Sequence, residues 1–492
     1  MSLRPPEKVE KLQRVLRAKA KESPGYRFYQ LYDKVYREDI LAWAYARCRA
    51  NGGAPGVGGQ RFEDIETSGR EQWLRELAQE LRNKTYRPSA VRRVWIPKAD
   101  GKQRPLGIPT IRDRVVQMAF VLVVEPIFDE DLQPEQHAYR AGHDAHQAVR
   151  DVQAWLDRGY TEVVDADLSG YFDTIPHHEL MKCLARRISD RHLLHLVKMW
   201  LEAAVEETDE QGRTVRTTRN KDEGRGTPQG SVASPLLANL YMRRFVLGCQ
   251  YLLEKTALGH EQRLDAHIVN YADDFVICCR PRRAEEALSV MRKMMEAIQL
   301  TVNEQKTRRC SLPAETFKFL GFEFGPQVSW KTGRRYLTPT PAKKKVQAIC
   351  DKISEATSAR TSWRETAVEV RELNQMLSGW ANYFRIGYVT GAWQIVQQHA
   401  CRRLRQWLQR KTKSRGGPQN PPDLRLYEDY GLLKLATSIR RKPLWAKARS
   451  SGRRAGCGRS ARPVRRAGSG TAASPATAPL LDSTSIQLIH NF

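Results

Sequence analysis

The sequence lacks paired cysteines and long apolar runs. Its nine cysteines are scattered and none forms the C-x-x-C spacing of a zinc ribbon, so we expect reduced cysteines, mostly in the core, and no zinc. No apolar run reaches the roughly 18 residues that a bilayer span requires, and the N-terminal residues show no signal-peptide pattern. We therefore expect a cytoplasmic protein without a membrane-spanning segment.

Acidic residues are also in short supply. The chain has 82 Lys and Arg against 55 Asp and Glu, a net charge of +27 and a pI near 9.9. Such an excess favours a polyanionic partner: nucleic acid is the natural one, and a membrane surface is the alternative. With 492 residues and 41% hydrophobic content, the chain is long enough for about three domains with packed cores.

The pattern of residues changes three times along the chain. Basic, helix-periodic residues and a Gly-rich connector at 51–59 predict a helical extension over 1–80. Strand and helix signals alternate over 81–335, starting with a strand and hairpin turn at 91–102, which is typical of an α+β domain. From 341 to 445 the pattern is almost wholly helical, so we expect a helical domain over 336–448, and the Arg-, Gly- and Ser-rich tail over 449–492 is expected to be disordered.

The helical segment contains an aromatic-rich apolar stripe. Its members recur every three or four residues, which predicts a helix that buries one face: Leu373, Met376, Leu377, Trp380, Tyr383 and Phe384. Gly379 within this stripe suggests close packing against a neighbour.

The same segment has a basic face. Leu404, Trp407 and Leu408 form an apolar seam, and no acidic residue compensates the arginines between positions 402 and 415. A solvated surface and contact with RNA phosphates both fit this pattern. The candidate RNA-binding residues are Arg402, Arg403, Arg405, Arg410 and Lys411.

Two adjacent carboxylates lie in a predicted hairpin turn. Asp273 and Asp274 stand between two short β-branched runs, at 267–270 and 275–278. An acidic pair in a tight turn is usually a solvated turn, because Asp tolerates turn geometry and bonds its own backbone. A polymerase also keeps its metal ligands in such a place, so both interpretations stay open at this point.

A second acidic segment is a natural partner for that turn. The alternation over 163–168 predicts a half-buried strand on which Asp165 and Asp167 share a face. Phosphoryl transfer by two cations roughly 4 Å apart needs carboxylates from separate segments, and Asp167 and Asp273 fit this need. We rank Asp273 ahead of Asp274, because neighbouring strand residues point oppositely, and we expect Mg²⁺ to stabilise the protein.

Seven motifs over residues 50–325 resemble those of group II intron-encoded reverse transcriptases, in the family's order. They are the segments 104–114, 137–146, 167–173, 226–239, 271–274, 303–307 and 319–322. The segment 377–385 resembles the signature of the family's maturase or thumb domain. The resemblance implies an α+β right-hand polymerase, with an RRM-like antiparallel sheet in its fingers and palm, followed by an all-helical thumb/maturase domain. The family's frequent HNH nuclease module, with its paired cysteines and histidines, has no counterpart in this sequence.

The resemblance also implies a nucleotide-binding set. Lys98 and Arg104 would hold the incoming triphosphate, although ordinary hairpin-surface charge is the alternative. Gln229, in Pro-Gln-Gly, would approach the nucleotide and template, or its neighbours could simply make a turn. Tyr171 would lie beneath the deoxyribose and exclude a 2′-hydroxyl, and a buried core aromatic is the competing interpretation.

Two further roles follow from the same resemblance. Lys306 would donate a proton to the pyrophosphate leaving group, unless it is merely solvated. Phe319, Leu320 and Gly321 would form the primer grip, or belong to the core. The chain departs from the family where Ser231 follows Pro-Gln-Gly, because Gly is common there.

The function expected from these features is RNA-directed DNA synthesis coupled to splicing. The catalytic set is Asp167, Asp273, Asp274 and Lys306, and the three aspartates would hold two Mg²⁺ ions, with Mn²⁺ as a possible substitute. Expected partners are the parent group II intron RNA, dNTPs and a DNA primer or target used in target-primed reverse transcription, where the protein would join the nucleoid. Monomer and dimer both remain open. The alternatives are a domesticated or defence-associated reverse transcriptase, and an RNA-binding maturase without synthesis.

Overall fold

The computed structural model describes residues 4–97, 101, 103–209, 211–253, 264–328, 332–412 and 423–435, and the predicted tail over 449–492 lies outside them. Two compact units divide the described chain, one within Met1–Ser311 and the other within Leu312–Asp482. The division precedes the predicted boundary at 335/336. Among the described residues, no helix is long and apolar enough to cross a membrane.

The first unit is built around one helix that is buried on nearly all sides. This helix, α6 (Ile111–Phe128), is mostly apolar after its first turn and is buried along most of its length, so other helices cover it. Thr110 caps its first turn by accepting a hydrogen bond from the Asp113 backbone N–H. The predicted N-terminal extension is helical, and its elements are α1 (Glu7–Glu22), α2 (Tyr32–Val35), α3 (Glu38–Asn51), α4 (Phe62–Ser68) and α5 (Arg70–Arg82). Of these, α1, α2 and α3 pack on α6.

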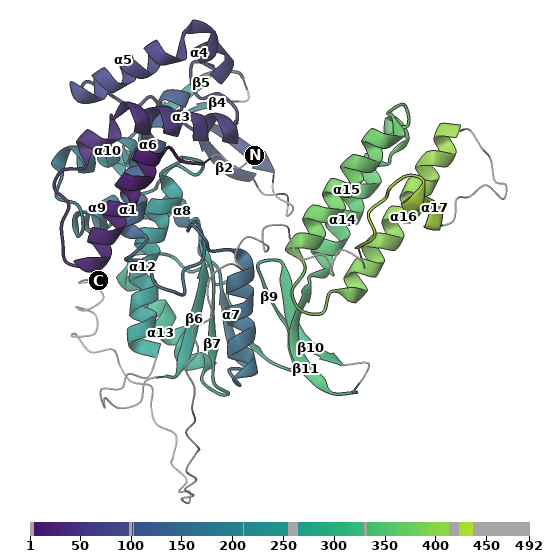
Figure 1. The fold of residues 1–492 in the computed structure, drawn as a ribbon. Coiled ribbons are helices and arrows are strands. Elements are labelled where there is room, and N and C mark those ends of the chain that lie inside the picture. Colours follow the sequence, from purple (N-terminus) through teal and green to yellow (C-terminus); the bar gives the residue numbers. More distant parts are fainter. Residues whose placement is uncertain are drawn as a thin grey trace, which may run out of the picture. The chain divides into compact units, whose positions relative to one another are not determined.

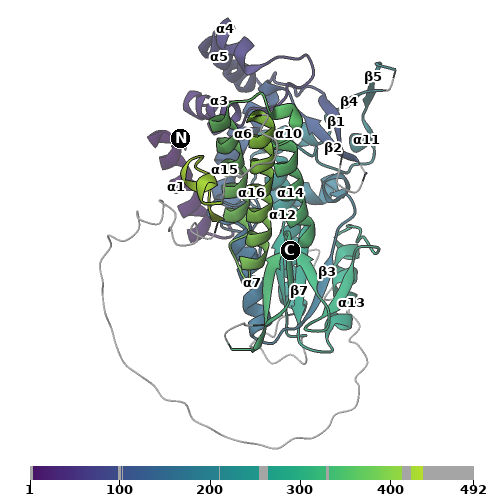
Figure 2. The same ribbon diagram turned by 90° about the vertical axis from the view of Figure 1, so that its right-hand side faces the viewer.

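A four-stranded sheet in the order β2-β1-β4-β5 contains the predicted first hairpin (Figure 2). The strands are β1 (Val91–Pro97), β2 (Gln103–Ile108), β4 (Val205–Thr208) and β5 (Thr214–Thr217), with the short helix α11 (Arg219–Asp222) after them. β1 pairs antiparallel with β2 and parallel with β4. The strands of the predicted hairpin are therefore confirmed.

A second four-stranded sheet carries both predicted acidic segments. Its order is β6-β7-β3-β8, and every neighbouring pair is antiparallel. Its strands are β3 (Glu162–Ala166), β6 (Ala266–Tyr271), β7 (Asp274–Cys279) and β8 (Arg308–Ser311). The helices α7 (Ala145–Asp157) and α12 (Ser234–Leu253) pack along β6, and α13 (Ala284–Ala297) packs against β3 and β7 (Figure 1). The predicted α+β class is confirmed.

Three short helices complete this unit: α8 (Tyr171–Thr174), α9 (His177–Ala185) and α10 (Arg191–Leu201). Asp190 caps α10 by accepting from the backbone N–H groups of His192 and Leu193. The same carboxylate accepts from the Leu31 and Tyr32 backbone N–H groups, so it also ties the N-terminal extension to this unit.

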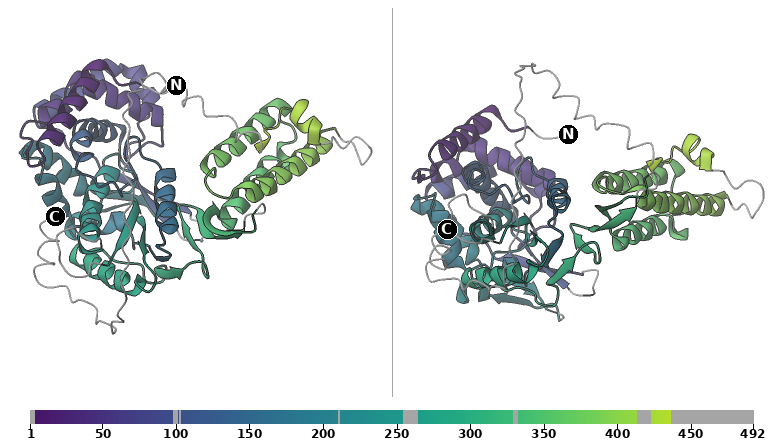
Figure 3. Two further views of the ribbon diagram at one scale, coloured as in Figure 1. Left: turned by 60° about the horizontal axis from the view of Figure 1, so that its bottom comes forward. Right: turned by 90° about the horizontal axis from the view of Figure 1, so that it is seen from below.

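The second unit begins with strands and continues with helices. Its sheet has the order β11-β10-β9, and the strands are β9 (Phe317–Phe319), β10 (Phe322–Val328) and β11 (Arg335–Pro341). The helical part comprises α14 (Lys343–Ala356), η1 (Ala359–Thr361), α15 (Thr366–Tyr383), α16 (Thr390–Thr412) and α17 (Asp423–Glu428). Figure 3 shows α14, α15 and α16, in green to yellow-green, lying side by side. Strand β11 therefore occupies the start of the helical domain predicted over 336–448.

The predictions about packing have mixed outcomes. The eight described cysteines are free, and all but Cys183 are buried, as expected. Leu373 and Leu377 of the aromatic-rich stripe are fully buried. The prediction for Gly379 was wrong, because a Cβ atom there would meet nothing within 4 Å.

Candidate active site

The two predicted turn aspartates lie at the tip of the β6–β7 hairpin. Tyr271 pairs with Asp274, so Ala272 and Asp273 form a two-residue turn, and Ala272 has a positive φ of 59°. The buried Asn270 side chain donates to the carbonyl oxygens of Ala272 at 2.9 Å and Asp274 at 3.4 Å. These hydrogen bonds hold Ala272 in the left-handed region, although it is not a glycine. They also fix the backbone position of Asp273 in the turn.

The register of β3 on β7 brings the second acidic segment beside that turn. Ala166 pairs with Phe275, and Asp165 pairs with Val276. Continuing this antiparallel register by one residue sets Asp167 opposite Asp274. Because strand side chains alternate, Asp165, Asp167 and Asp274 share one face of the sheet.

The electrostatics of Asp274 also reflect this convergence. Partial burial, together with the charges of Asp273, Asp167 and Asp165, raises the pKa of Asp274 to about 6, and Lys306 opposes the shift. The residue still has solvent access. Carboxylates from two remote stretches of sequence therefore repel one another at this edge of the sheet.

A loop after α13 supplies cationic and amide partners to these carboxylates. The Lys306 Nζ donates to Asp167 Oδ2 at 2.6 Å, and the Asn303 Nδ2 approaches the same oxygen at 3.5 Å. The Asn303 backbone N–H also donates to the Asp167 carbonyl at 2.8 Å. On β8, Arg308 forms an ion pair with Asp165 at 3.2 Å. Lys306, predicted from sequence to act on a leaving group, is thus placed against a predicted metal ligand.

The acidic group, which consists of Asp165, Asp167, Asp273 and Asp274, does not form a complete metal-binding site by itself. Among the residues that the structure describes, no group of three or more His, Cys, Asp or Glu side chains is arranged to hold a metal ion. The donor chemistry nevertheless fits Mg²⁺, because this ion takes one or two protein carboxylates and completes its shell with water and substrate phosphates.

The shifted pKa of Asp274 predicts how stability depends on pH when no divalent cation is present. The folded state holds this proton more tightly than the unfolded chain between about pH 4 and pH 6, so stability falls as pH rises through that window. Asp274→Asn should flatten the slope and stabilise the protein at pH 7 by about 1 kcal/mol, a small value because solvent screens the carboxylate. Denaturant titrations in EDTA at pH 4.5 and 7 measure this. An unchanged slope in Asp274→Asn contradicts it.

Tyr171 is a buried aromatic residue next to this acidic group. Its side chain is 3% exposed, and its hydroxyl donates to the Ala238 carbonyl at 2.6 Å. Burial, followed by the charges of Tyr241 and Asp273, raises the pKa of Tyr171 well above its ordinary value. The ring belongs to the core, as one interpretation of the sequence held. It also lies within the electrostatic range of Asp273, which is compatible with the other interpretation, a place beneath the deoxyribose.

Removing the Tyr171 ring is expected to admit ribonucleotides. Tyr171→Ala should lower the preference for dNTP over rNTP by about 10- to 100-fold, because the ring would no longer exclude a 2′-hydroxyl. Tyr171→Phe is the matched control: it keeps the ring, loses only the bond to Ala238, and should keep the preference. Single-nucleotide incorporation gives the ratio of kcat/KM values. Equal sugar discrimination in Tyr171→Ala and the wild type rejects the gate.

The Pro-Gln-Gly turn is locked to the first sheet. The Gly107 N–H donates to the Gln229 carbonyl at 2.5 Å, and a Cβ atom on Gly230 would lie 2.6 Å from the Gly107 carbonyl oxygen. On the other side of the turn, Gln117 Oε1 accepts from the Ser231 hydroxyl at 2.6 Å and from the Val232 N–H at 3.0 Å. Ser231, the departure from the family pattern, therefore contributes an anchor.

The side-chain amide oxygen of Gln229 has no hydrogen-bond donor among the described residues. Its Oε1 atom is buried and accepts no hydrogen bond within the described part of the chain. An unsatisfied buried acceptor is unfavourable unless a ligand completes it. This supports the predicted role of Gln229 in binding.

Tyr139 lies within electrostatic range of Asp273 and of Arg104. Arg104 is exposed on β2, whereas Lys98 lies outside the described residues. Burial raises the pKa of Tyr139, Asp273 adds to the shift and Arg104 opposes it, so this tyrosine is within range of both charges. Tyr139 is 49% exposed with a φ of 56°, a strained backbone that often marks functional sites. We did not predict a role for it, although it lies in the recognised segment 137–146.

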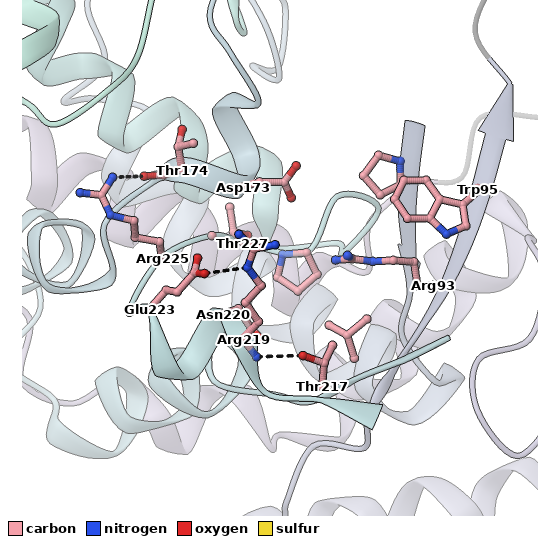
Figure 4. Close-up of a pocket in the computed structure, with 14 residues that line it drawn as sticks. Arg93, Trp95, Asp173, Thr174, Thr217, Arg219, Asn220, Glu223, Arg225 and Thr227 are labelled. Atoms are coloured by element: carbon pink, nitrogen blue, oxygen red, sulfur yellow. Dashed lines mark hydrogen bonds and ion pairs between the residues drawn. The ribbon is translucent and has the colours of Figure 1, made fainter. Parts of the chain in front are cut away.

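A cavity of about 400 Å³ lies where β1, α8 and the segment before Gln229 meet. Figure 4 shows Arg93 extending from β1 toward Thr227 and Asp173, with Trp95 beside it. Arg219, also on its wall, donates to Glu223 at 2.6 Å. Guanidinium groups and an aromatic ring are side-chain types that contact nucleic acid.

The predicted primer grip forms a tight turn in the second unit. Leu320 and Gly321 both have positive φ, at 50° and 80°, as a two-residue hairpin between β9 and β10 requires. Phe319 is buried, and the Leu320 carbonyl accepts from the Tyr383 hydroxyl at 2.9 Å. The core role that we considered for this motif therefore applies to Phe319.

The predicted RNA-binding residues of α16 divide into two kinds. Arg402, Arg410 and Lys411 are exposed, and Lys411 also donates to the Arg364 carbonyl. Arg403 donates to the carbonyls of Ser354 and Thr357, and Arg405 forms an ion pair with Asp423.

Comparison with known proteins gives two family matches in the order of the two units. Residues 96–324 match the reverse transcriptase (RNA-dependent DNA polymerase) family, and residues 346–420 match the group II intron maturase-specific domain. Protein YkfC of Escherichia coli K12 is 34% identical over 334 residues, which cover 61% of this chain and 84% of YkfC.

Intron-encoded relatives are similar over smaller shares of their length. The group II intron-encoded protein LtrA of Lactococcus lactis is 32% identical over 45% of this chain and 35% of LtrA. An uncharacterized 91 kDa protein in the cob intron of Schizosaccharomyces pombe is 23% identical over 84% of this chain and 59% of that protein. With both domain matches in this order, the chain belongs to the group II intron-encoded reverse transcriptases, RNA-directed DNA polymerases that carry a maturase domain.

Proposed function

We propose that this protein extends a DNA primer along the intron RNA that encodes it, by target-primed reverse transcription, and helps that RNA to splice. The observation that carries this proposal is the convergence of Asp167, Asp273 and Asp274 from two remote segments. The proposed setting is the cytoplasm, with the protein on the nucleoid when it engages target DNA.

In this proposal Asp167 and Asp273 hold two Mg²⁺ ions, and Mn²⁺ is a possible substitute. Asp274, which lies on the same face of the sheet as Asp167, would be a further ligand. The bound cations would neutralise charge on the transferring phosphoryl group and lower the pKa of the primer 3′-hydroxyl. Lys306 forms an ion pair with Asp167, and its ammonium group would donate a proton to the departing pyrophosphate.

The nucleotide would lie between the first sheet and the acidic turn. Arg104, with Lys98, would bind the triphosphate, because guanidinium and ammonium groups match phosphate charge. Gln229 would use its unsatisfied carbonyl to contact the nucleotide or template. Tyr171, fixed through Ala238, would set the distance available to the sugar.

The helical part of the second unit would bind structured intron RNA. Over 343–412 it has 13 Lys and Arg against 5 Asp and Glu. A-form RNA offers little sequence readout to side chains, so recognition would rely on shape and phosphates contacted by Arg402, Arg410 and Lys411. The protein would stabilise the active RNA fold and leave the splicing chemistry to the RNA.

Primer extension on poly(rA)/oligo(dT) tests the enzymatic part directly. We expect Mg²⁺-dependent DNA products from the purified full chain, and sequencing of copurifying RNA should recover a group II intron. RNA binding without extension would instead support a maturase that has lost synthesis. Extension with unrelated RNA bound would favour a domesticated or defence-associated enzyme.

Mg²⁺ is expected to stabilise the protein as well as to activate it. Binding should relieve the repulsion among the clustered carboxylates and raise the Tm at pH 7, by an amount that grows with Mg²⁺ concentration. Asp273→Asn, which lacks one ligand, should show a smaller rise than Asp222→Asn, an exposed control on α11. Thermal melts across a Mg²⁺ titration measure the effect. An active protein whose Tm ignores Mg²⁺ contradicts it.

A further inference from the structure

The loop between α14 and α15 exposes a tryptophan. Trp363 is 80% exposed, the highest value among the large hydrophobic residues that the structure describes as exposed. An indole left in water forgoes one of the largest burial energies of any side chain. Because Trp363 stays exposed on a loop that is held in place, we considered which ligand would cover its ring.

This loop is fixed by one ridge of α16. Arg403 donates to the Ser354 carbonyl at 2.7 Å and the Thr357 carbonyl at 3.0 Å, which satisfies the last turn of α14. One turn further along, the Trp407 Nε1 donates to the Thr361 hydroxyl at 3.1 Å.

The ridge consists of Arg403, Trp407 and Lys411, and its last member contacts Arg364, the residue after Trp363. One more turn along α16, the Lys411 ammonium donates to the carbonyl of Arg364. Residues 403, 407 and 411 are spaced four apart, so they lie on one face of α16. The loop that presents Trp363 is therefore held at its start, middle and end.

The neighbouring arginine is turned toward α15. Arg364 pairs with Glu372 at 2.8 Å and with Glu369 at 3.6 Å, and Glu369 is fully buried. These ion pairs keep the Arg364 guanidinium engaged with carboxylates of α15. Arg364 is therefore bound to α15, whereas the indole of Trp363 is exposed to solvent.

Charged residues, most of them basic, flank Trp363 in sequence and stand at the end of α16 that contacts its loop. Arg360 and Glu365 are exposed close to Trp363 in sequence, and Arg410 and Lys411 are exposed at the end of α16, where Lys411 binds the carbonyl of Arg364. Trp363 is the one large hydrophobic residue that the structure describes as exposed in the loop between α14 and α15, although Tyr388, Ile395, Leu424 and Tyr430 are exposed elsewhere in the helical part. A protein-binding hot spot usually lies within an apolar, desolvated patch, whereas an exposed aromatic ring on a loop that a lysine contacts suits a nucleic-acid base and its phosphates.

We propose that Trp363 stacks on an unpaired base of a bound single-stranded RNA segment, with Arg360 and Arg410 contacting the flanking phosphates. The inference deepens the proposed function, because it adds a base-stacking contact to an otherwise phosphate-based RNA surface. It requires RNA with an unpaired base and predicts no preference for blunt duplex.

Equilibrium binding of the full chain to two RNA probes tests this site: a 12-nucleotide single strand and a blunt duplex of equal length. Trp363→Ala should weaken binding to the single strand by about 10-fold, the effect of losing one stacked base, and leave duplex binding unchanged. Trp363→Phe should restore most of the affinity. Tyr336→Ala, which removes an exposed aromatic on β11, is the matched control and should have no effect.

The salt dependence separates stacking from charge. Trp363→Ala should leave the slope of log affinity against log salt unchanged, whereas Arg410→Ala should reduce it by about 0.7, the value for one phosphate on a single strand. Equal single-strand affinity for Trp363→Ala and wild type overturns the proposal. So does a loss that appears only as altered self-association in sedimentation, because the ring would then bind protein.

The same measurements distinguish this proposal from the function that it rests on. If the wild type binds intron RNA and extends a primer while Trp363→Ala binds RNA equally well, only the stacking site fails. If the wild type does neither, the proposed function fails.

Discussion

Asp273→Asn is expected to abolish DNA synthesis and leave RNA-assisted splicing nearly intact. The amide is close in shape to the carboxylate, so the turn braced by Asn270 should survive. The lost charge is the one that would bind cations and oppose the charge of the transition state. We expect a loss on the order of 10³-fold in the rate of primer extension.

Two assays on the same preparation measure this separation. Primer extension on poly(rA)/oligo(dT) reports synthesis, and splicing of the copurifying intron at low Mg²⁺ reports the maturase function. Asp222→Asn, which removes an exposed carboxylate elsewhere, should affect neither. Loss of both activities in Asp273→Asn would show that the turn is needed for RNA binding or folding, and the assignment would be wrong.

Gly230→Ala is expected to reduce synthesis by about 100-fold without unfolding the protein. Its Cβ atom would lie 2.6 Å from the Gly107 carbonyl oxygen and 2.7 Å from Leu106 Cδ1, and its φ of 105° is strained for any residue with a Cβ. The turn must therefore move away from β2, and Gln229 moves with it. A displacement near 1 Å in a binding group is enough for an effect of this size.

Gly379→Ala is the matched control for this substitution. Gly379 lies inside α15 with nothing within 4 Å of the added methyl group, so alanine should raise helix stability by up to about 1 kcal/mol. Steady-state kinetics and thermal melts of both variants are compared. Gly230→Ala with wild-type kcat/KM would mean that the position of Gln229 does not matter.

Local patterns in the sequence were sufficient to predict the acidic hairpin and its partner strand. Alternating β-branched residues around Asp273 and Asp165 favour strands, and Asp tolerates turns. The secondary structure of each segment can therefore be predicted from its own residues. The convergence of Asp167 and Asp273 was predicted from the chemistry of two-cation phosphoryl transfer, since no local pattern specifies which strands pair. Pairing depends on long-range packing that the helices α7, α12 and α13 complete.

The positioning side chains could not be predicted in this way. Gln117 lies on α6, far in sequence from Ser231, and nothing in its neighbourhood signals a buried amide that receives two hydrogen bonds. Arg403 is a similar case, because a charge run suggests phosphate contacts and its hydrogen bonds to α14 appear only in three dimensions. Gly379 shows the reverse error, since a glycine in an apolar stripe suggested close packing that is absent.

The central claim is that acidic side chains from the two segments share bound cations. A crystal structure with primer, RNA template, a non-hydrolysable nucleotide and Mn²⁺, analysed by anomalous scattering, tests it most directly. We predict two Mn²⁺ peaks, with Asp167 and Asp273 both coordinating at least one common ion. Peaks that contact neither aspartate, or an ordered nucleotide bound away from Asp167 and Asp273, would contradict the account.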